Sequence, residues 1–189
     1  MKLLNLGCGG NRRNEYPWIN MDYCFHFLDP HVKECMEKEE TYVDHDMLKK
    51  PWPFDNDEFE GIVASHVFEH FNCQDDLLII NECYRILKPT GILRISVPDP
   101  ELFFSKTVAK DYHWGDKPEH ENRPFMDEAL FFEEHVQVLS YYGLCCMAWS
   151  AGFREMYKSR FGFSAIQTLS MVDSRPQFTL FMEAKKGEI

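Results

Sequence analysis

The chain has 189 residues, a length typical of one domain around a single hydrophobic core. Its 31 acidic and 20 basic residues give a formal net charge of −11 at pH 7. Binding to nucleic acid without sequence preference depends on Lys and Arg that neutralise phosphates, so we expect no nucleic-acid partner. Hydrophobic residues make up 44% of the chain, which is enough for a packed core and excludes a disordered chain.

The seven cysteines are an odd set without a C-x-x-C pair, which indicates a reduced, intracellular protein. The apolar stretch at the start of the chain is far shorter than the apolar region of a signal peptide. No apolar run approaches the roughly 20 residues that cross a bilayer. We therefore expect a cytoplasmic protein that does not enter a membrane.

Short apolar runs separated by turn-rich stretches dominate the first half of the chain. They predict strands over 3–6, 19–22, 41–43 and 61–65. Apolar residues at helical spacing predict a helix over 75–87, which ends before Pro89-Thr90-Gly91. A fifth strand is expected directly afterwards, over 92–97.

Residues 99–135 break this pattern, since ten acidic residues, four basic residues and three histidines follow one another without a clean period. We interpret this segment as an insertion that forms a lid. Helical spacing returns over 136–150, where Gly152 can cap the helix in a left-handed conformation. Two further strands are expected near 165–172 and 178–184. Strands that alternate with helices predict a single α/β domain with an open, mostly parallel sheet.

Ligands of such sheets bind at the carboxyl ends of the strands. Glycines at 7–10 follow the first strand, and without a Cβ they let a ligand approach the backbone closely. Asp22 ends the second strand, and its carboxylate can accept hydrogen bonds from both hydroxyls of a ribose. Asp46 follows the third strand and suits an adenine amino group, with Met47 as an apolar wall for the ring.

Two common nucleotide-binding patterns do not fit these residues. The dinucleotide fingerprint G-x-G-x-x-G needs a glycine where Arg12 stands, and its acidic residue about 20 positions further on, whereas Asp22 comes only 13 positions after Gly9. The sequence G-x-x-x-x-G-K-[ST] of a P-loop is absent. Both hydride transfer with a nicotinamide cofactor and P-loop phosphate binding are therefore disfavoured.

Several runs of residues resemble successive motifs of class I S-adenosylmethionine-dependent methyltransferases. The runs are Leu4 to Gly10, Ile19 to Asp22, Asp46, Ala64 to His70, Glu82 to Gly91 and Val97 to Asp99. The resemblance covers residues 2–99, resumes over 135–153 and touches the closing strand. It is nearest to the short methyltransferases predicted among surface-glycan genes.

The resemblance implies a Rossmann-like, seven-stranded sheet with an antiparallel last strand, and S-adenosylmethionine as the cofactor. The cofactor-binding residues on this resemblance are Gly7, Cys8, Gly9, Gly10, Asp22, Tyr23, Asp46, Met47, Ser65 and His66. It also implies a first helix reduced to a turn, since only eight residues separate Gly10 from Ile19. The acceptor of the methyl group is expected to be a small molecule or glycan-like. The sequence does not decide between a monomer and a homodimer.

Methyl transfer needs mainly positioning and the exclusion of water, because the positive sulfur already activates the methyl carbon. A base is needed only when the acceptor is a hydroxyl or an unactivated amine. His66, His70, Asp99 and His135 are candidates, and we favour His70 or His135 as the catalytic residue. This chemistry requires no metal ion. The acidic lid favours a neutral or cationic acceptor over a polyanion.

Two alternatives remain open. His66-Val67-Phe68-Glu69-His70 spells H-x-x-E-H, which on a helix would place two histidines on one face and is typical of a zinc hydrolase. The glycine turn and Asp22 would have no role in such an enzyme. The other alternative is a catalytically inactive scaffold that binds the nucleoside cofactor and transfers nothing.

Overall fold

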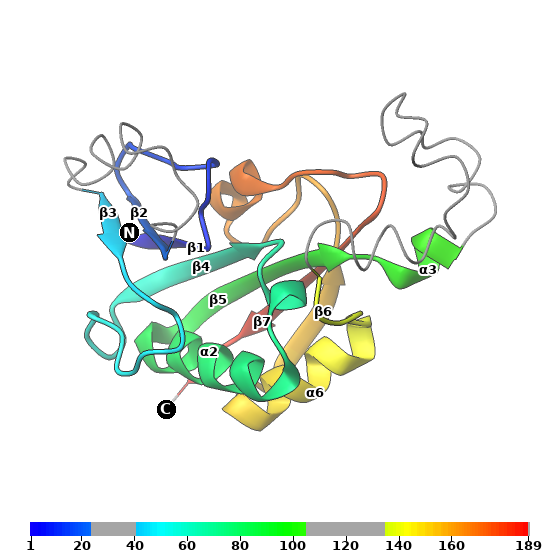
Figure 1. Cartoon of the computed structure of the whole chain (residues 1–189). Helices are drawn as coiled ribbons and strands as arrows, with labels where there is room; N and C mark the ends of the chain where they lie inside the picture. Colours follow the sequence, from blue (N-terminus) through cyan, green and yellow to red (C-terminus); the bar gives the residue numbers. More distant parts are fainter. Residues whose placement is uncertain (24–40, 105–134, 189) are drawn as a thin grey trace.

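In the computed structural model, which describes residues 1–23, 41–104 and 135–188, seven strands form one sheet (Figure 1). Their order across the sheet is β3-β2-β1-β4-β5-β7-β6. The strands are β1 (Leu3–Leu6), β2 (Trp18–Asp22), β3 (Tyr42–Asp44), β4 (Phe59–Ser65), β5 (Leu87–Pro98), β6 (Glu155–Ser159) and β7 (Thr179–Lys185). The first five are parallel, and β7 runs antiparallel to both of its neighbours. The predicted fold class, including its antiparallel last strand, is therefore confirmed.

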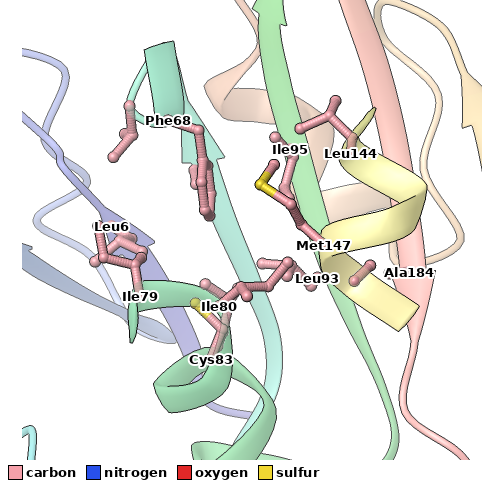
Figure 2. Packing of buried hydrophobic residues seen from close by; sticks show 14 of the residues in the cluster. Leu6, Phe68, Ile79, Ile80, Cys83, Leu93, Ile95, Leu144, Met147 and Ala184 are labelled. Carbon is pink, nitrogen blue, oxygen red and sulfur yellow. The ribbon is translucent and has the colours of Figure 1, made fainter. Parts of the chain in front are cut away.

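Among the described residues, α2 (Cys73–Ile86) and α6 (Tyr141–Ala151) cover one face of the sheet, and Figure 1 shows them side by side. Their buried side chains interdigitate with those of the strands in the main core (Figure 2). Labelled in that figure are Leu6, Phe68, Ile79, Ile80, Cys83, Leu93, Ile95, Leu144, Met147 and Ala184. The apolar residues of the two helices therefore attach them to the sheet.

The predicted helix over 75–87 corresponds to α2, which begins two residues earlier. The side chain of Asn72 caps it by accepting hydrogen bonds from the backbone N–H groups of Gln74 (2.9 Å) and Asp75 (3.1 Å). After Ile86 the chain passes directly into β5, whose later part is the strand predicted over 92–97. At the turn inside β5, Thr90 has a φ of +66°.

The helix predicted over 136–150 begins later, at Tyr141. The backbone N–H groups of Val136 (2.8 Å) and Gln137 (3.3 Å) both donate to the carbonyl of Glu69, which holds this stretch outside a helix. Ser140 then caps α6, because its hydroxyl accepts the N–H of Gly143 at 3.1 Å. At the other end Gly152 has the expected left-handed conformation, with a φ of +116°.

The strand predicted near 165–172 is wrong, since most of this stretch is the 3-10 helix η3 (Gln167–Val172). Leu169 and Val172, three positions apart, pack against Leu3 and Val63 in a second, smaller core on the opposite face of the sheet from α2. The sixth strand is formed by residues 155–159 instead, at the edge of the sheet beside β7. The strand predicted over 178–184 corresponds to β7 and is confirmed.

The connection between β1 and β2 contains turns and no helix, as the short spacing predicted. Two buried asparagines hold it. The side-chain amide of Asn5 donates to the carbonyls of Asn11 (2.8 Å) and of the Asn20 side chain (3.1 Å). Asn20 in turn exchanges two hydrogen bonds with the backbone of Arg13, at 2.8 and 2.9 Å. Side-chain amides thus satisfy the backbone groups that a helix would otherwise pair.

A buried ion-pair network ties β5 and β7 to the loop after β6. Arg94 is fully buried, and its guanidinium donates to Asp173 (2.7 and 2.8 Å) and Glu183 (2.8 Å). It also donates to the carbonyls of Arg160 and Phe163, at 3.0 and 2.8 Å. Burial and the neighbouring Glu183 carboxylate raise the pKa of Tyr157, whose hydroxyl donates to Glu183.

The acidic segment predicted as a lid is described only at its two ends. α3 (Pro100–Phe104) follows Asp99, whose carboxylate accepts the N–H of Glu101 at 2.9 Å. Residues 105–134, and with them the lid itself, lie outside the described residues. Among the described residues, no helix has the length and apolar character needed to span a membrane.

Candidate active site

The glycine turn after β1 packs against the segment that follows β4. Gly7 has a φ of +63°, and a Cβ placed on it would lie 2.5 Å from Cγ2 of Val67 and 3.4 Å from Cε of Met47. Its N–H donates to the carbonyl of Met21 at 2.8 Å. A residue without a side chain is required here, because both the backbone conformation and the close contact exclude a Cβ.

Asp22 accepts two backbone hydrogen bonds at the end of β2. The N–H of Gly9 donates to Oδ2 at 2.6 Å, and the N–H of Tyr23 donates to Oδ1 at 2.7 Å. A carboxylate oxygen has two lone pairs, so each oxygen can accept one more hydrogen bond, as from a ribose hydroxyl. A Cβ on Gly9 would have no atom of the described residues within 4 Å, so among these residues the turn borders open space beside this carboxylate.

The end of β3 lies against the end of β2, because the N–H of His45 donates to the carbonyl of Asp22 at 3.0 Å. In the turn that follows, the Asp46 carboxylate accepts the N–H of Leu48 at 3.0 Å. Met47 is buried, and its carbonyl accepts the indole N–H of Trp52 at 2.9 Å. Met47 therefore presents an apolar side chain beside the glycine turn, while its carbonyl is already bonded.

At the end of β4, Ser65 and His66 are held by β5. The hydroxyls of Ser96 and Ser65 lie 3.1 Å apart, and the N–H of His66 donates to the carbonyl of Ser96 at 2.9 Å. His66 has a φ of +56°, a left-handed conformation that costs free energy in a residue with a side chain. This conformation marks the point where the chain leaves the sheet.

The ring of His66 is held between two side chains. Its Nδ1 lies 2.9 Å from Oε1 of Glu69, and its Nε2 lies 3.2 Å from the hydroxyl of Thr179. The residues after it form η1 (Phe68–His70), a single 3-10 turn, rather than the regular helix that the zinc-hydrolase interpretation needs. Both ring nitrogens of His66 therefore contact Glu69 and Thr179, and His66 does not form a set of metal ligands with His70.

A different constellation forms at η1. The described residues gather Glu69, His70 and His135, each with one potential ligand atom, and these atoms all lie within 4.8 Å of one another. The rings of His70 and His135 meet edge to face, with centroids 5.0 Å apart. The two histidines favoured as catalytic are therefore neighbours, although 65 positions separate them in the sequence.

Gln137, two residues after His135, anchors this segment of the chain to the start of α2. Its side-chain amide donates to the carbonyl of Phe71 at 2.7 Å and to the carboxylate of Asp76 in the first turn of α2. Burial raises the pKa of Asp76 to about 7, and the nearby Glu69 and Asp75 carboxylates add to this effect, whereas the bond from Gln137 opposes it. Sequence reasoning missed Gln137 and Asp76, since neither belongs to a recognisable motif.

Asp99 was the remaining candidate base. Its side chain is buried at the start of α3, where it caps that helix, and its N–H donates to the carbonyl of Phe178 at 2.7 Å. Its capping bond gives Asp99 a structural role at the end of β5.

Comparisons with known proteins agree with this geometry. Residues 4–95 match the family model of a methyltransferase domain. An S-adenosylmethionine-dependent methyltransferase from Archaeoglobus fulgidus aligns over 98% of this chain and 86% of its own, with a TM-score of 0.63 and 16% identity. An S-adenosylmethionine-dependent methyltransferase from Thermotoga maritima aligns over 98% of this chain and 82% of its own, with a TM-score of 0.61 and 16% identity.

A third solved structure, an S-adenosylmethionine-dependent methyltransferase from Mesorhizobium loti, aligns over 98% of this chain and 90% of its own, with a TM-score of 0.58 and 14% identity. The search of curated proteins finds no match. At 14–16% identity, the structural alignments show a shared fold. The family model matches residues 4–95 of the chain. Together they show a fold shared with these methyltransferases and a match to a methyltransferase domain over residues 4–95.

Proposed function

We propose that this protein transfers a methyl group from S-adenosylmethionine to a small-molecule or glycan-like acceptor. The observation that carries the proposal is the junction of Gly9 with Asp22, where a carboxylate borders a glycine turn at the carboxyl ends of β1 and β2. A carboxylate with spare lone pairs beside open space suits the two hydroxyls of a ribose. The family match over residues 4–95 covers this junction.

The remaining cofactor contacts follow from the order of the strand ends. Residues 7–10 line the methionine part of the cofactor, while Asp22 and Tyr23 hold the ribose. Asp46 and the apolar side chain of Met47 hold the adenine ring. Ser65 and His66 close the pocket beside the sulfonium. Gly7 supports this arrangement, because a Cβ on it would meet both Val67 and Met47, so three of the strand ends lie close together.

In the transfer itself, a lone pair of the acceptor attacks the methyl carbon while the carbon–sulfur bond breaks and S-adenosylhomocysteine leaves. A hydroxyl acceptor also loses a proton. We propose that His70 or His135 takes up that proton, since His70 follows the end of β4, at the same edge of the sheet as the glycine turn, and the ring of His135 lies against that of His70. The segment 99–135 would select the acceptor, and its acidic character favours a neutral or cationic one.

Ligand-dependent thermal unfolding tests the proposal. A ligand that binds only the folded state stabilises it by about 2.7 kcal/mol at a concentration 100-fold above its Kd, so S-adenosylhomocysteine should raise the Tm. Asp22→Ala should remove this shift, because the ribose loses its acceptor. Asp55→Ala is the matched control: Asp55 is exposed, precedes β4 and therefore lies at the opposite edge of the sheet.

Two results would contradict the proposal. No Tm shift at millimolar S-adenosylhomocysteine would rule out cofactor binding. The inactive scaffold would instead be favoured by two results together. The Tm shift would depend on Asp22, and a panel of hydroxyl and amine acceptors would consume no labelled methyl donor.

A further inference from the structure

We propose that Glu69, His70 and His135 bind one divalent transition-metal ion. The three side chains come from two segments far apart in the sequence, and their potential ligand atoms all lie within 4.8 Å of one another. Ligand atoms around one tetrahedral ion are about 3.4 Å apart when metal–ligand distances are about 2.1 Å. His70 is exposed and His135 is partly exposed, so both side chains have room to rotate toward that separation when an ion binds.

The state of Glu69 is the second observation. The residue is 1% exposed, and its Oε1 faces Nδ1 of His66 at 2.9 Å. Its Oε2 is buried, and it has no hydrogen-bond partner in the part of the chain that the structure describes. A buried carboxylate oxygen without a partner costs free energy, on the order of 1–3 kcal/mol. A cation at the centre of the cluster would supply the missing interaction.

The surroundings of the cluster fit a preorganised site. An ionised carboxylate only accepts hydrogen bonds, so in its pair with Glu69 the His66 Nδ1 is the donor. Hydrogen bonds of this kind orient metal ligands and are a regular part of metal centres. The segment that carries His135 is fixed independently, since the Glu69 carbonyl accepts the N–H groups of Val136 and Gln137.

The donor set points to the class of ion. Two imidazole nitrogens and one carboxylate oxygen suit Zn²⁺, Fe²⁺, Co²⁺ or Ni²⁺, whereas Mg²⁺ and Ca²⁺ prefer oxygen ligands alone. Three protein ligands leave at least one coordination position open, as in catalytic zinc sites. The zinc-hydrolase interpretation had assigned His66 as a ligand, and in the proposed site His135 takes that place.

The open position gives the ion a role that rests on the proposed function. An acceptor hydroxyl bound there would have a lowered pKa and could release its proton to water before attacking the methyl carbon. The same lone pairs of His70 and His135 cannot bind a metal ion and take up a proton together. Direct base catalysis by these histidines would then be unnecessary.

Co²⁺ titration of the full-length chain, first stripped with a chelator, tests the site. We expect one Co²⁺ per chain with visible absorption bands of a four- or five-coordinate ion, displaced by Zn²⁺. His70→Ala and His135→Ala should each weaken binding at least tenfold. Glu69→Gln should do the same, and its thermal unfolding is followed in parallel, because this residue is buried.

His45→Ala is the matched control, since His45 lies after β3 and its ring contacts the carbonyl of Lys49 instead of the cluster. It should bind Co²⁺ as the unmodified chain does. Undiminished binding in both the His70→Ala and His135→Ala variants, or no binding at all, would overturn the proposed metal site. Separate measurement of the Tm shift with S-adenosylhomocysteine distinguishes this failure from a failure of the proposed function.

Discussion

Gly9 and Asp22 are joined by a hydrogen bond of 2.6 Å from the backbone N–H of the glycine to Oδ2 of the aspartate. The bond connects the turn after β1 to the end of β2, and it orients a carboxylate beside Gly9, whose missing Cβ would contact none of the described residues. A cofactor that lies across both strand ends would therefore meet a preformed surface.

The first prediction concerns the packing of Gly7. Gly7→Ala should destabilise the fold by about 1–3 kcal/mol, because the new methyl group overlaps Cγ2 of Val67 in a left-handed backbone conformation. Chemical denaturation measures the loss. Gly10→Ala is the control, since a Cβ there meets no atom within 4 Å in the described part of the chain, and the stability of this variant should be nearly unchanged. Equal losses in the two variants would contradict the packing argument.

The second prediction concerns the buried network around Arg94. Arg94→Met should lower the free energy of unfolding by about 3–5 kcal/mol, because it leaves the carboxylates of Asp173 and Glu183 buried without their cation. Denaturant titration measures the change. Arg154→Met is the control: Arg154 is exposed and lies over the ring of Trp149, so we expect a loss under about 1 kcal/mol.

The third prediction concerns pH. Burial raises the pKa of Asp76 in the folded protein to about 7, from the ordinary aspartate value of 3.8. Between these values the folded state keeps a proton that the unfolded state has released, so this group lowers stability as the pH rises from about 4 to about 7. Asp76→Asn should flatten that dependence, which denaturation midpoints across this range measure. Asp55→Asn, at an exposed position, should keep the slope of the unmodified chain.

The fourth prediction concerns Thr90, a β-branched residue with a φ of +66°. Thr90→Gly should stabilise the protein by up to about 1 kcal/mol. The free energy gained by removing a side chain from the left-handed conformation exceeds the free energy lost because glycine raises the entropy of the unfolded chain. Thermal unfolding checks the sign. The same substitution at Thr168, which lies in η3 without a positive φ, should destabilise. A loss of stability at Thr90 would show that its side chain contributes more than its conformation costs.

The strands β1 and β4 were predicted from sequence because each is an apolar run that is almost wholly buried in the parallel part of the sheet. The same reasoning placed Gly7, Asp22, Asp46 and His66 at strand ends, since each follows its run directly. The structure brings two of these ends together in the bond between Gly9 and Asp22. Local pattern sufficed here because the strand and its end are contiguous in the sequence.

The sequence misled where an element depends on a distant neighbour. β6 is mostly exposed and pairs only with β7, so its residues carry no apolar alternation. Residues 165–172 were predicted as a strand, yet Leu169 and Val172 lie three positions apart and both pack with Leu3 in the smaller core, where the chain forms a 3-10 helix. Likewise, residues 136–140 have helical spacing in the sequence but form no helix, because the N–H groups of Val136 and Gln137 donate to the carbonyl of Glu69.

The sequence by itself determined the sheet's parallel half and which side chains stand at its strand ends, because these depend on residues next to one another in the chain. Only the tertiary structure decided that His135 meets His70 beside Glu69, and that Arg94 neutralises two buried carboxylates. Those contacts join segments tens of residues apart. Backbone hydrogen bonds and burial, which no local pattern encodes, hold them in place.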